Sequence, residues 1–355
     1  MKPVTSEEAV AVFSTDWHLD STNIEQITEL VRQQCKLAEK LEVKLLVCLG
    51  DVFESRIAQR EDVLTAFGVI LDVIQEHKLK LLLIPGNHDK TNYFGEDSFL
   101  TPFKTHPCLA LIERAGGYPF PNHNLHLHFL PYFKQGIWLD RFAKLVEYIG
   151  ESNVQSEEKH ILCTHISITG SRDNDNHYSS STISASLFKD FFKVFSGHYH
   201  NQQKISKNFY HLPAIRQAEF DEDEDKGFTV LYSDGSHNFV KSTFKKFIKL
   251  EIDLDNSCFE DLVLLKQRFS NNKDNIRFEF IGSEKALKAL KKEDFVSIGI
   301  DVKTKSREIE DDIKYSETEE VKEHTSGTIR EEFTKFCIQD KLIEEIGLPY
   351  LNKKL

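Results

Sequence analysis

The sequence has few of the features that mark membrane or exported proteins. No apolar run in its 355 residues approaches the roughly 18 residues that a membrane-spanning helix needs. Residues 1–5 lead into an acidic stretch and not into the apolar core of a signal peptide. A hydrophobic content of 40% also excludes a disordered or collagen-like chain. We therefore expect a soluble protein of the cytoplasm with no membrane partner.

Paired cysteines and excess positive charge are also missing. The six cysteines stand far apart, and none forms a Cys-x-x-Cys pair, which disfavours a disulfide framework and a structural zinc site. The chain holds 45 Lys and Arg against 57 Asp and Glu, a net charge of -12. This balance argues against a general binder of polyanions. Nucleic acid is not excluded, because the distribution of charge matters more than its sum.

The first two thirds of the chain repeat one arrangement, in which a short apolar run ends in polar residues and a helical pattern follows. Apolar spacing predicts helices over about residues 27–38 and 63–74. Strands are predicted at residues 9–14, 44–49, 80–85, 125–130, 160–163, 193–195 and 228–232. This alternation predicts an α/β sheet with helices on its faces, and such sheets bind ligands in the loops after their strands.

The composition changes along the chain and predicts four parts. Residues 1–243 carry 24 basic and 33 acidic residues, whereas residues 245–305 carry 13 and 11. We expect the α/β domain over 1–243, a small α+β domain over 244–305, an acidic linker over 306–326 and a helical segment over 327–355.

Secondary structure can be predicted in more detail for the small domain and for the last segment. The small domain is predicted to contain strands at 247–254 and 277–281 and a helix at 259–269. The last segment has an apolar helical stripe that could dock on a partner or fold back on its own chain; it includes Ile329, Phe333, Phe336 and Ile343.

Five clusters of metal-competent residues follow the predicted strands. They are Asp16-Trp17-His18, Gly50-Asp51, Gly86-Asn87-His88-Asp89, Thr164-His165 and Gly197-His198-Tyr199-His200. Carboxylate, imidazole and amide oxygen suit Mn²⁺, Fe²⁺ or Zn²⁺. Each cluster alone is common in turns and helix caps, but together they predict a metal site. Two metal ions about 3.5 to 4 Å apart need a shared anionic ligand, for which Asp51 is the natural bridge.

These clusters resemble the pattern of the calcineurin-like metallophosphoesterases over residues 8–235. Gly50-Asp51-Val52-Phe53 with Arg56, the segment 85–89 and the segment 196–200 resemble the SbcD type of DNA repair nuclease subunit and its phage recombination-endonuclease relatives. The resemblance implies a four-layer α/β/β/α core with a small α+β capping domain and a C-terminal helical tail.

The resemblance also implies two divalent cations, with Mn²⁺ as the first candidate and Mg²⁺, Fe²⁺ or Zn²⁺ as others. Carried over by position, the ligands of one ion would be Asp16, His18, Asp51 and His200, and those of the second Asp51, Asn87, His165 and His198. His88 would contact the scissile phosphate and assist the leaving oxygen, and Asp89 would orient it or cap a helix. Glu54 stands where the family often has His or Asp, so its role is open.

The function implied by the resemblance is a manganese-dependent 3′ to 5′ exonuclease on duplex DNA ends that also cleaves single strands internally. Its partners would be DNA ends, an SbcC-type coiled-coil ATPase docked on the C-terminal helix, and a second copy of the nuclease domain, in the cytoplasm of a bacterium or a phage-infected host. The alternative is a phosphatase or phosphodiesterase for nucleotides, cyclic nucleotides or phosphoproteins. A scaffold without activity is disfavoured, because every ligand position is filled.

Other polar groups have two interpretations each. Four lysines of the small domain are predicted on one helix and could track a phosphate backbone or form a solvated face: Lys285, Lys288, Lys291 and Lys292. We expect His126 and His128 on an exposed strand face and the acidic run 221–225 in an exposed turn between strands.

Overall fold

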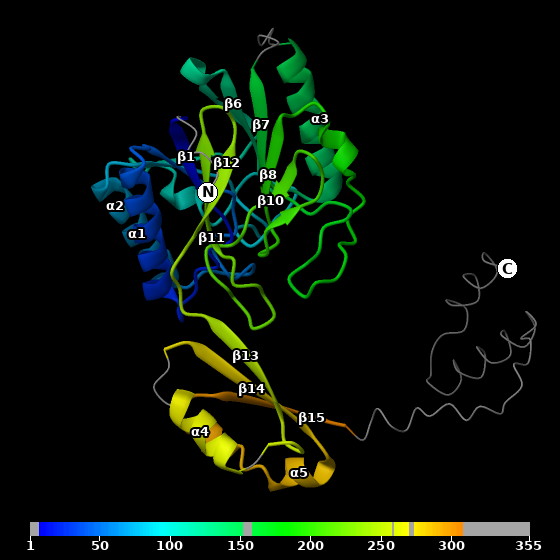
Figure 1. Cartoon of the computed structure of the whole chain (residues 1–355). Helices are drawn as coiled ribbons and strands as arrows, with labels where there is room; N and C mark the ends of the chain where they lie inside the picture. Colours follow the sequence, from blue (N-terminus) through cyan, green and yellow to red (C-terminus); the bar gives the residue numbers. More distant parts are fainter. Residues whose placement is uncertain (1–6, 152–157, 258, 270–272, 308–355) are drawn as a thin grey trace, which may run out of the picture.

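Two six-stranded sheets form the larger part of the protein. The computed structural model describes residues 7–151, 158–257, 259–269 and 273–307 (Figure 1). In the order β12-β11-β1-β2-β3-β4, the first sheet consists of His237–Lys241, Gly227–Tyr232, Ala9–Ser14, Leu45–Cys48, Lys80–Leu83 and Leu109–Leu111. In the order β5-β6-β7-β8-β10-β9, the second consists of Gly116–Phe120, Leu125–Leu130, Lys159–His165, Lys193–Gly197, Phe209–His211 and Gln203–Lys204.

Three helices cover the outer faces of these sheets. They are α1 (Ile24–Lys40), α2 (Glu61–Glu76) and α3 (Gln135–Glu151). Helices α1 and α2 share a buried apolar cluster with Val12 of β1, whereas Phe13 of β1 faces the second sheet and packs on Phe195 of β8. On the other side, Trp138 of α3 packs with Leu162 of β7. The layers are therefore α/β/β/α, and the expected core architecture is confirmed.

The predicted strands and the first two helices are confirmed within a few residues, and β1 has the predicted bounds. Helix α3 was not predicted, although Trp138, Phe142 and Leu145 have the i, i+4, i+7 spacing of an amphipathic helix. Edge strands such as β5 and β9 were also not predicted, because they are short and half exposed. Among the described residues, no helix combines the length and apolar character needed to cross a bilayer.

A separate three-stranded parallel sheet follows the first two (Figure 1). Its elements are β13 (Phe247–Asp253), α4 (Phe259–Phe269), β14 (Asn275–Gly282), α5 (Glu284–Ala289), α6 (Glu293–Val296) and β15 (Asp301–Ser306). Alternate residues of β14 are buried, and Phe278 and Phe280 pack against Phe295 of α6. The two predicted strands and the helix are confirmed, whereas β15 was not predicted and includes Ser306, the first residue of the proposed linker.

The division into four parts itself stays a prediction. Residues 308–326 of the linker and the helical segment lie outside the described residues, together with the stripe of Ile329, Phe333, Phe336 and Ile343.

The predicted single lysine helix is wrong. Lys285 and Lys288 lie on α5, but Lys291 and Lys292 lie between α5 and α6, because the chain leaves helical geometry at Leu290. All four lysines are exposed, and Lys288 forms an ion pair with Glu284. Their role in binding DNA stays a prediction.

The acidic run 221–225 lies between β10 and β11, as expected, and it contacts the small sheet. Lys249 Nζ lies 2.8 Å from Asp221 Oδ1, and Lys246 Nζ lies 2.7 Å from Glu224 Oε2. The run is exposed except for Glu222, which is buried. The expectation of an exposed turn is therefore wrong at this one residue.

Candidate metal centre

The structure brings all five polar clusters together at the carboxyl ends of strands. Asp16 and His18 follow β1, Asp51 follows β2, and Asn87 follows β3 in the first sheet. From the second sheet come His165, the last residue of β7, and His198 and His200, which follow β8. Six of these seven residues form two groups with ligand atoms within 4.8 Å of one another: Asp16, His18 and His200, and Asp51, His165 and His198. Asn87 touches the second group.

The backbone at this edge is strained. Four of the predicted ligands have positive φ angles: Asp16 at 52°, His18 at 49°, Asp51 at 51° and His198 at 93°. Such a conformation costs a non-glycine residue about 1–3 kcal/mol and is typical of functional sites. The strain turns these side chains inward from the strand ends.

The first group centres on two facing imidazoles. His18 Nε2 lies 2.9 Å from His200 Nε2 and 4.0 Å from Asp16 Oδ1. Asp16 also accepts hydrogen bonds from the backbone N–H of His198, at 3.2 Å from each carboxylate oxygen. This carboxylate therefore links the first cluster to the last one.

The second group centres on the amide oxygen of Asn87. Asn87 Oδ1 lies 3.1 Å from His165 Nε2 and 2.8 Å from His198 Nδ1. Asp51 Oδ2 lies 3.2 Å from the same His165 nitrogen. It also lies 4.0 Å from His18 Nε2 in the first group. Asp51 thus stands between the two groups, where a bridging ligand would have to be.

Two of the imidazoles donate a hydrogen bond from Nδ1 to an oxygen atom, and a third has a carboxylate oxygen close to Nδ1. His165 Nδ1 donates to the carbonyl of Leu49 at 2.7 Å, and His200 Nδ1 donates to Glu222 Oε1 at 2.5 Å. His18 Nδ1 lies 2.7 Å from Glu54 Oε2. In the neutral form of His165 and His200, the hydrogen is therefore on Nδ1 and Nε2 presents a lone pair. Orientation of this kind is typical of histidines that bind metals.

This arrangement fits divalent cations. His18 Nε2 and His200 Nε2 face each other at 2.9 Å. His165 Nε2 likewise faces the oxygens of Asn87 and Asp51. Lone pairs at such distances repel unless a proton or a cation lies between them, and imidazole with carboxylate and amide oxygen suits a borderline divalent ion. The donor set therefore matches a pair of such ions.

The carboxylates also attract positive charge strongly. Burial alone would lower the pKa of His165, but the charge of Asp51 and its hydrogen bond outweigh this and raise the pKa to about 9. For His18, burial opposes the hydrogen bond to Glu54 and the charges of Asp51 and Asp16, and the pKa is raised. Asp51 is buried, yet the neighbouring His165 holds its pKa well below the usual range.

His88 lies at the mouth of this centre beside an arginine. Its Nδ1 donates to the carbonyl of Glu54 at 2.5 Å, and Nε2 lies 2.5 Å from Arg56 Nη2 and 4.0 Å from Asp51 Oδ2. Partial burial lowers the pKa of His88, and the charge of Arg56 acts in the same direction. Glu54 therefore contributes its carboxylate to His18 and its carbonyl to His88, which gives a structural role to the residue whose role was open.

Asp89 does not orient His88, so that prediction is wrong. Its Oδ1 accepts hydrogen bonds from the backbone N–H groups of Val52 and Phe53, and its Oδ2 accepts one from Gly86. Burial and the charge of Asp51 raise the pKa of Asp89 to about 7, while these amides act in the opposite direction. The side chain joins the loop after β2 to the loop after β3, and it does not cap a helix.

Glu222 also contacts the candidate ligand His200, and it was not predicted as part of the site. Its Oε1 accepts the hydrogen of His200 Nδ1, and its Oε2 accepts from the N–H of Ala218 at 3.1 Å and lies 3.3 Å from Lys226 Nζ. Although burial would raise the pKa of Glu222, the contact with His200 and the charge of Lys226 lower it to about 2. The one local signal for a special role of Glu222 among the five acids was Lys226, four residues later.

We expect Glu222→Gln to weaken metal binding by about 10- to 100-fold, because a neutral amide holds the His200 ring less firmly than a carboxylate. The measurement is the Mn²⁺ concentration that gives half-maximal hydrolysis of a bis-aryl phosphodiester. Asp225→Asn is the matched control, since Asp225 is exposed and pairs with Lys241. Equal metal requirements in both variants would show that Glu222 does not support His200.

The comparisons with known proteins agree with this geometry. The model of the calcineurin-like phosphoesterase family matches residues 10–202. The SbcD subunit of the SbcCD nuclease of Staphylococcus epidermidis is 22% identical over 296 residues, which cover 76% of this chain and 78% of the relative. A protein named as a putative phosphoesterase, 244L of Invertebrate iridescent virus 6, is 24% identical over 291 residues. These residues cover 79% of this chain and 96% of the viral protein.

Among solved structures, a dimetal phosphatase from Danio rerio aligns with a TM-score of 0.45 and 12% identity, covering 63% of this chain and 93% of that one. The family match spans more than half of the chain and contains all five polar clusters. The chain belongs to the calcineurin-like phosphoesterase family.

Proposed function

We propose that the protein is a two-metal phosphodiesterase that hydrolyses DNA. The observation that carries the proposal is the position of Asp51 between two groups of inward-facing ligand atoms. One ion would be held by Asp16, His18, Asp51 and His200, and the other by Asp51, Asn87, His165 and His198. Two bound divalent cations supply Lewis acidity and lower the pKa of a water molecule.

His88 and Arg56 are placed to act on the substrate. An incoming phosphodiester would accept the hydrogen bond that Arg56 Nη2 now directs at His88 Nε2, 2.5 Å away. Its negative charge would favour a hydrogen on Nε2, while Nδ1 stays bonded to the Glu54 carbonyl. His88 would then donate the Nε2 hydrogen to the leaving oxygen as a general acid.

The proposal of DNA as substrate rests on the similarity to a relative named as a nuclease subunit, which extends over 76% of this chain. We propose a manganese-dependent 3′ to 5′ exonuclease on duplex ends with endonuclease activity on single strands. It would work in the cytoplasm with a coiled-coil ATPase bound by residues 327–355 and would pair through the nuclease domains. Lys285, Lys288, Lys291 and Lys292 are exposed and could contact the DNA backbone.

The test is the degradation of linear duplex DNA labelled at either end, by the full chain with Mn²⁺, Mg²⁺ or EDTA. We expect manganese-dependent loss that begins at the 3′ end. His88→Ala should lower the rate by about 10²-fold or more, because a general acid contributes that much. His123→Ala is the matched control, since His123 ends a short 3-10 helix before β6 (Pro121–His123), away from the strand ends that form the site.

Two outcomes would contradict the proposal in different ways. If duplex and single-stranded DNA both stay intact while a bis-aryl phosphodiester is hydrolysed, the metal centre is retained and the substrate is a small phosphoester. If His88→Ala degrades DNA as fast as His123→Ala does, His88 is not the general acid.

A further inference from the structure

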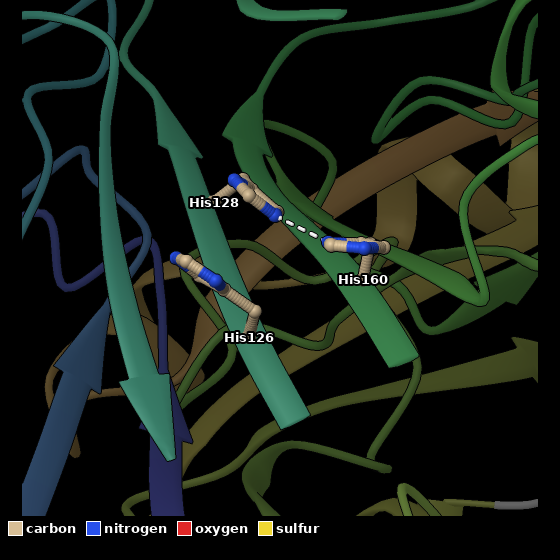
Figure 2. Close-up of side chains that lie close together, drawn as sticks. All are labelled: His126, His128 and His160. Atoms are coloured by element: carbon tan, nitrogen blue, oxygen red, sulfur yellow. Dashed lines mark hydrogen bonds between the residues drawn. The ribbon is translucent and has the colours of Figure 1, made fainter. Parts of the chain in front are cut away.

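Three histidines form a second cluster, away from the candidate metal centre. His126 and His128 lie on β6 and His160 lies on β7, and one ring nitrogen of each lies within 4.8 Å of the others (Figure 2). His128 Nε2 lies 2.8 Å from His160 Nδ1, and the rings of His126 and His128 stack with centroids 4.3 Å apart.

The fold places these side chains on one face of the second sheet. Residues two apart on a strand share a face, and His126 stands opposite His160 in the parallel pairing of β6 and β7. Their neighbours Leu127 and Ile161 point into the core between the sheets, so the three histidines point to the outer side, where His128 contacts the ring of Phe191. The expected exposed face is therefore wrong for His128, which is 2% exposed.

His126 and His160 lie near the starts of β6 and β7, at the end of the strands opposite the candidate centre, and His128 lies in the middle of β6. His160 stands near the start of β7 and His165 ends it, and five residues of strand span about 16 Å. Neither ligand group described above includes any of the three histidines. The cluster therefore needs an explanation of its own.

The rings are suited to binding as neutral ligands. Burial, and the neighbouring imidazoles after it, lower the pKa of His128 to about 3. Burial also lowers the pKa of His126 and of His160, whereas Glu158 acts in the opposite direction on both. At neutral pH each ring has one unprotonated nitrogen, and the neutral ring is the form that binds metals.

We propose that His126, His128 and His160 bind a transition-metal ion, and we assign it as Zn²⁺. Imidazole ligands suit zinc, and three of them leave a fourth position for water or a carboxylate. Glu158 Oε2 lies 3.9 Å from His126 Nδ1 and could take that position. The ion would take the place of the hydrogen shared by His128 and His160, and that hydrogen would move to the other nitrogen of the same ring, which stays neutral.

The geometry requires only small movements. Tetrahedral zinc with bonds of about 2.0–2.1 Å places its ligand nitrogens about 3.3 Å apart. The 2.8 Å separation between His128 Nε2 and His160 Nδ1 would lengthen slightly. The ring nitrogen of His126, which lies within 4.8 Å of the other two, would move closer to them. The side chain of His126 is 21% exposed. A bound ion would tie β6 to β7 without contacting the candidate centre.

The test is a count of zinc in the full-length protein after metal removal with EDTA, reloading with Zn²⁺ and gel filtration. We expect His126→Gln and His160→Gln each to hold one equivalent less than the wild type, and His123→Gln to hold as much. His126→Gln and His160→Gln should still hydrolyse a bis-aryl phosphodiester as fast as the wild type does. This activity would show that the two variants are folded and that the candidate metal centre is intact.

Cobalt provides the second readout. Three imidazoles in a tetrahedral site give bound Co²⁺ an intense visible absorption, which His160→Gln should lose and His123→Gln should keep. Equal zinc contents in all four proteins, or a cobalt spectrum unchanged by His160→Gln, would overturn the proposal. The proposed hydrolytic function would be unaffected by that result.

Discussion

Asp51→Asn is expected to lower the rate of phosphodiester hydrolysis by at least about 10³-fold, which corresponds to about 4 kcal/mol of transition-state stabilisation. Asp51 Oδ2 lies 3.2 Å from His165 Nε2 and 4.0 Å from His18 Nε2, and Oδ1 accepts the N–H of His88 at 2.8 Å. Asparagine keeps the shape of the side chain but removes the negative charge that two cations would share.

The measurement is kcat for a bis-aryl phosphodiester at saturating Mn²⁺, with thermal unfolding to show that the variant is folded. Asp62→Asn serves as the matched control, because Asp62 is exposed at the start of α2 and pairs with Arg60. A kcat of Asp51→Asn within tenfold of the control would rule out Asp51 as the bridging ligand.

Gly50→Ala is expected to lower the free energy of unfolding by about 2–5 kcal/mol and to abolish activity. Gly50 has a φ of +97°, and a Cβ there would lie 2.6 Å from Gly86 N and 2.9 Å from His165 Nδ1. The first contact forces apart the loops after β2 and β3. The second displaces the His165 ring from the carbonyl of Leu49 and turns its Nε2 away from Asp51.

Urea denaturation of the wild type and of Gly50→Ala measures this loss of free energy of unfolding. Gly136→Ala is the control, because a Cβ at Gly136 meets nothing within 4 Å and the residue lies in α3. Alanine in a helix is favoured over glycine by up to about 1 kcal/mol, so this variant should be as stable as the wild type or more so. If Gly50→Ala unfolds at the same urea concentration as the wild type, the close approach of the two loops is not required.

Local patterns predicted much of the fold because buried parallel strands have strong local signals. The apolar run of β1 has the bounds that the structure shows, and polar clusters lie at the carboxyl ends of five predicted strands: β1, β2, β3, β7 and β8. Since parallel strands place these ends at one edge, the convergence of Asp16, Asp51 and Asn87 could be predicted from order alone.

The groups that hold the candidate ligands could not be predicted in the same way. Glu222 lies in a run of five acids and becomes a partner of His200 only because the chain between β10 and β11 folds over that ring. Asp89 supports two loops through backbone N–H groups, and a sequence pattern does not show which amides a carboxylate meets. The burial of His128 likewise depends on Phe191 from a distant segment.

Electron paramagnetic resonance of the Mn²⁺-loaded protein tests most directly whether Asp51 bridges two metal ions, as we propose. Two Mn²⁺ ions about 3.5–4 Å apart are magnetically coupled. We predict a coupled spectrum that Asp51→Asn abolishes and Asp62→Asn retains. A six-line spectrum of isolated ions from the wild-type protein at saturating Mn²⁺ would contradict the claim.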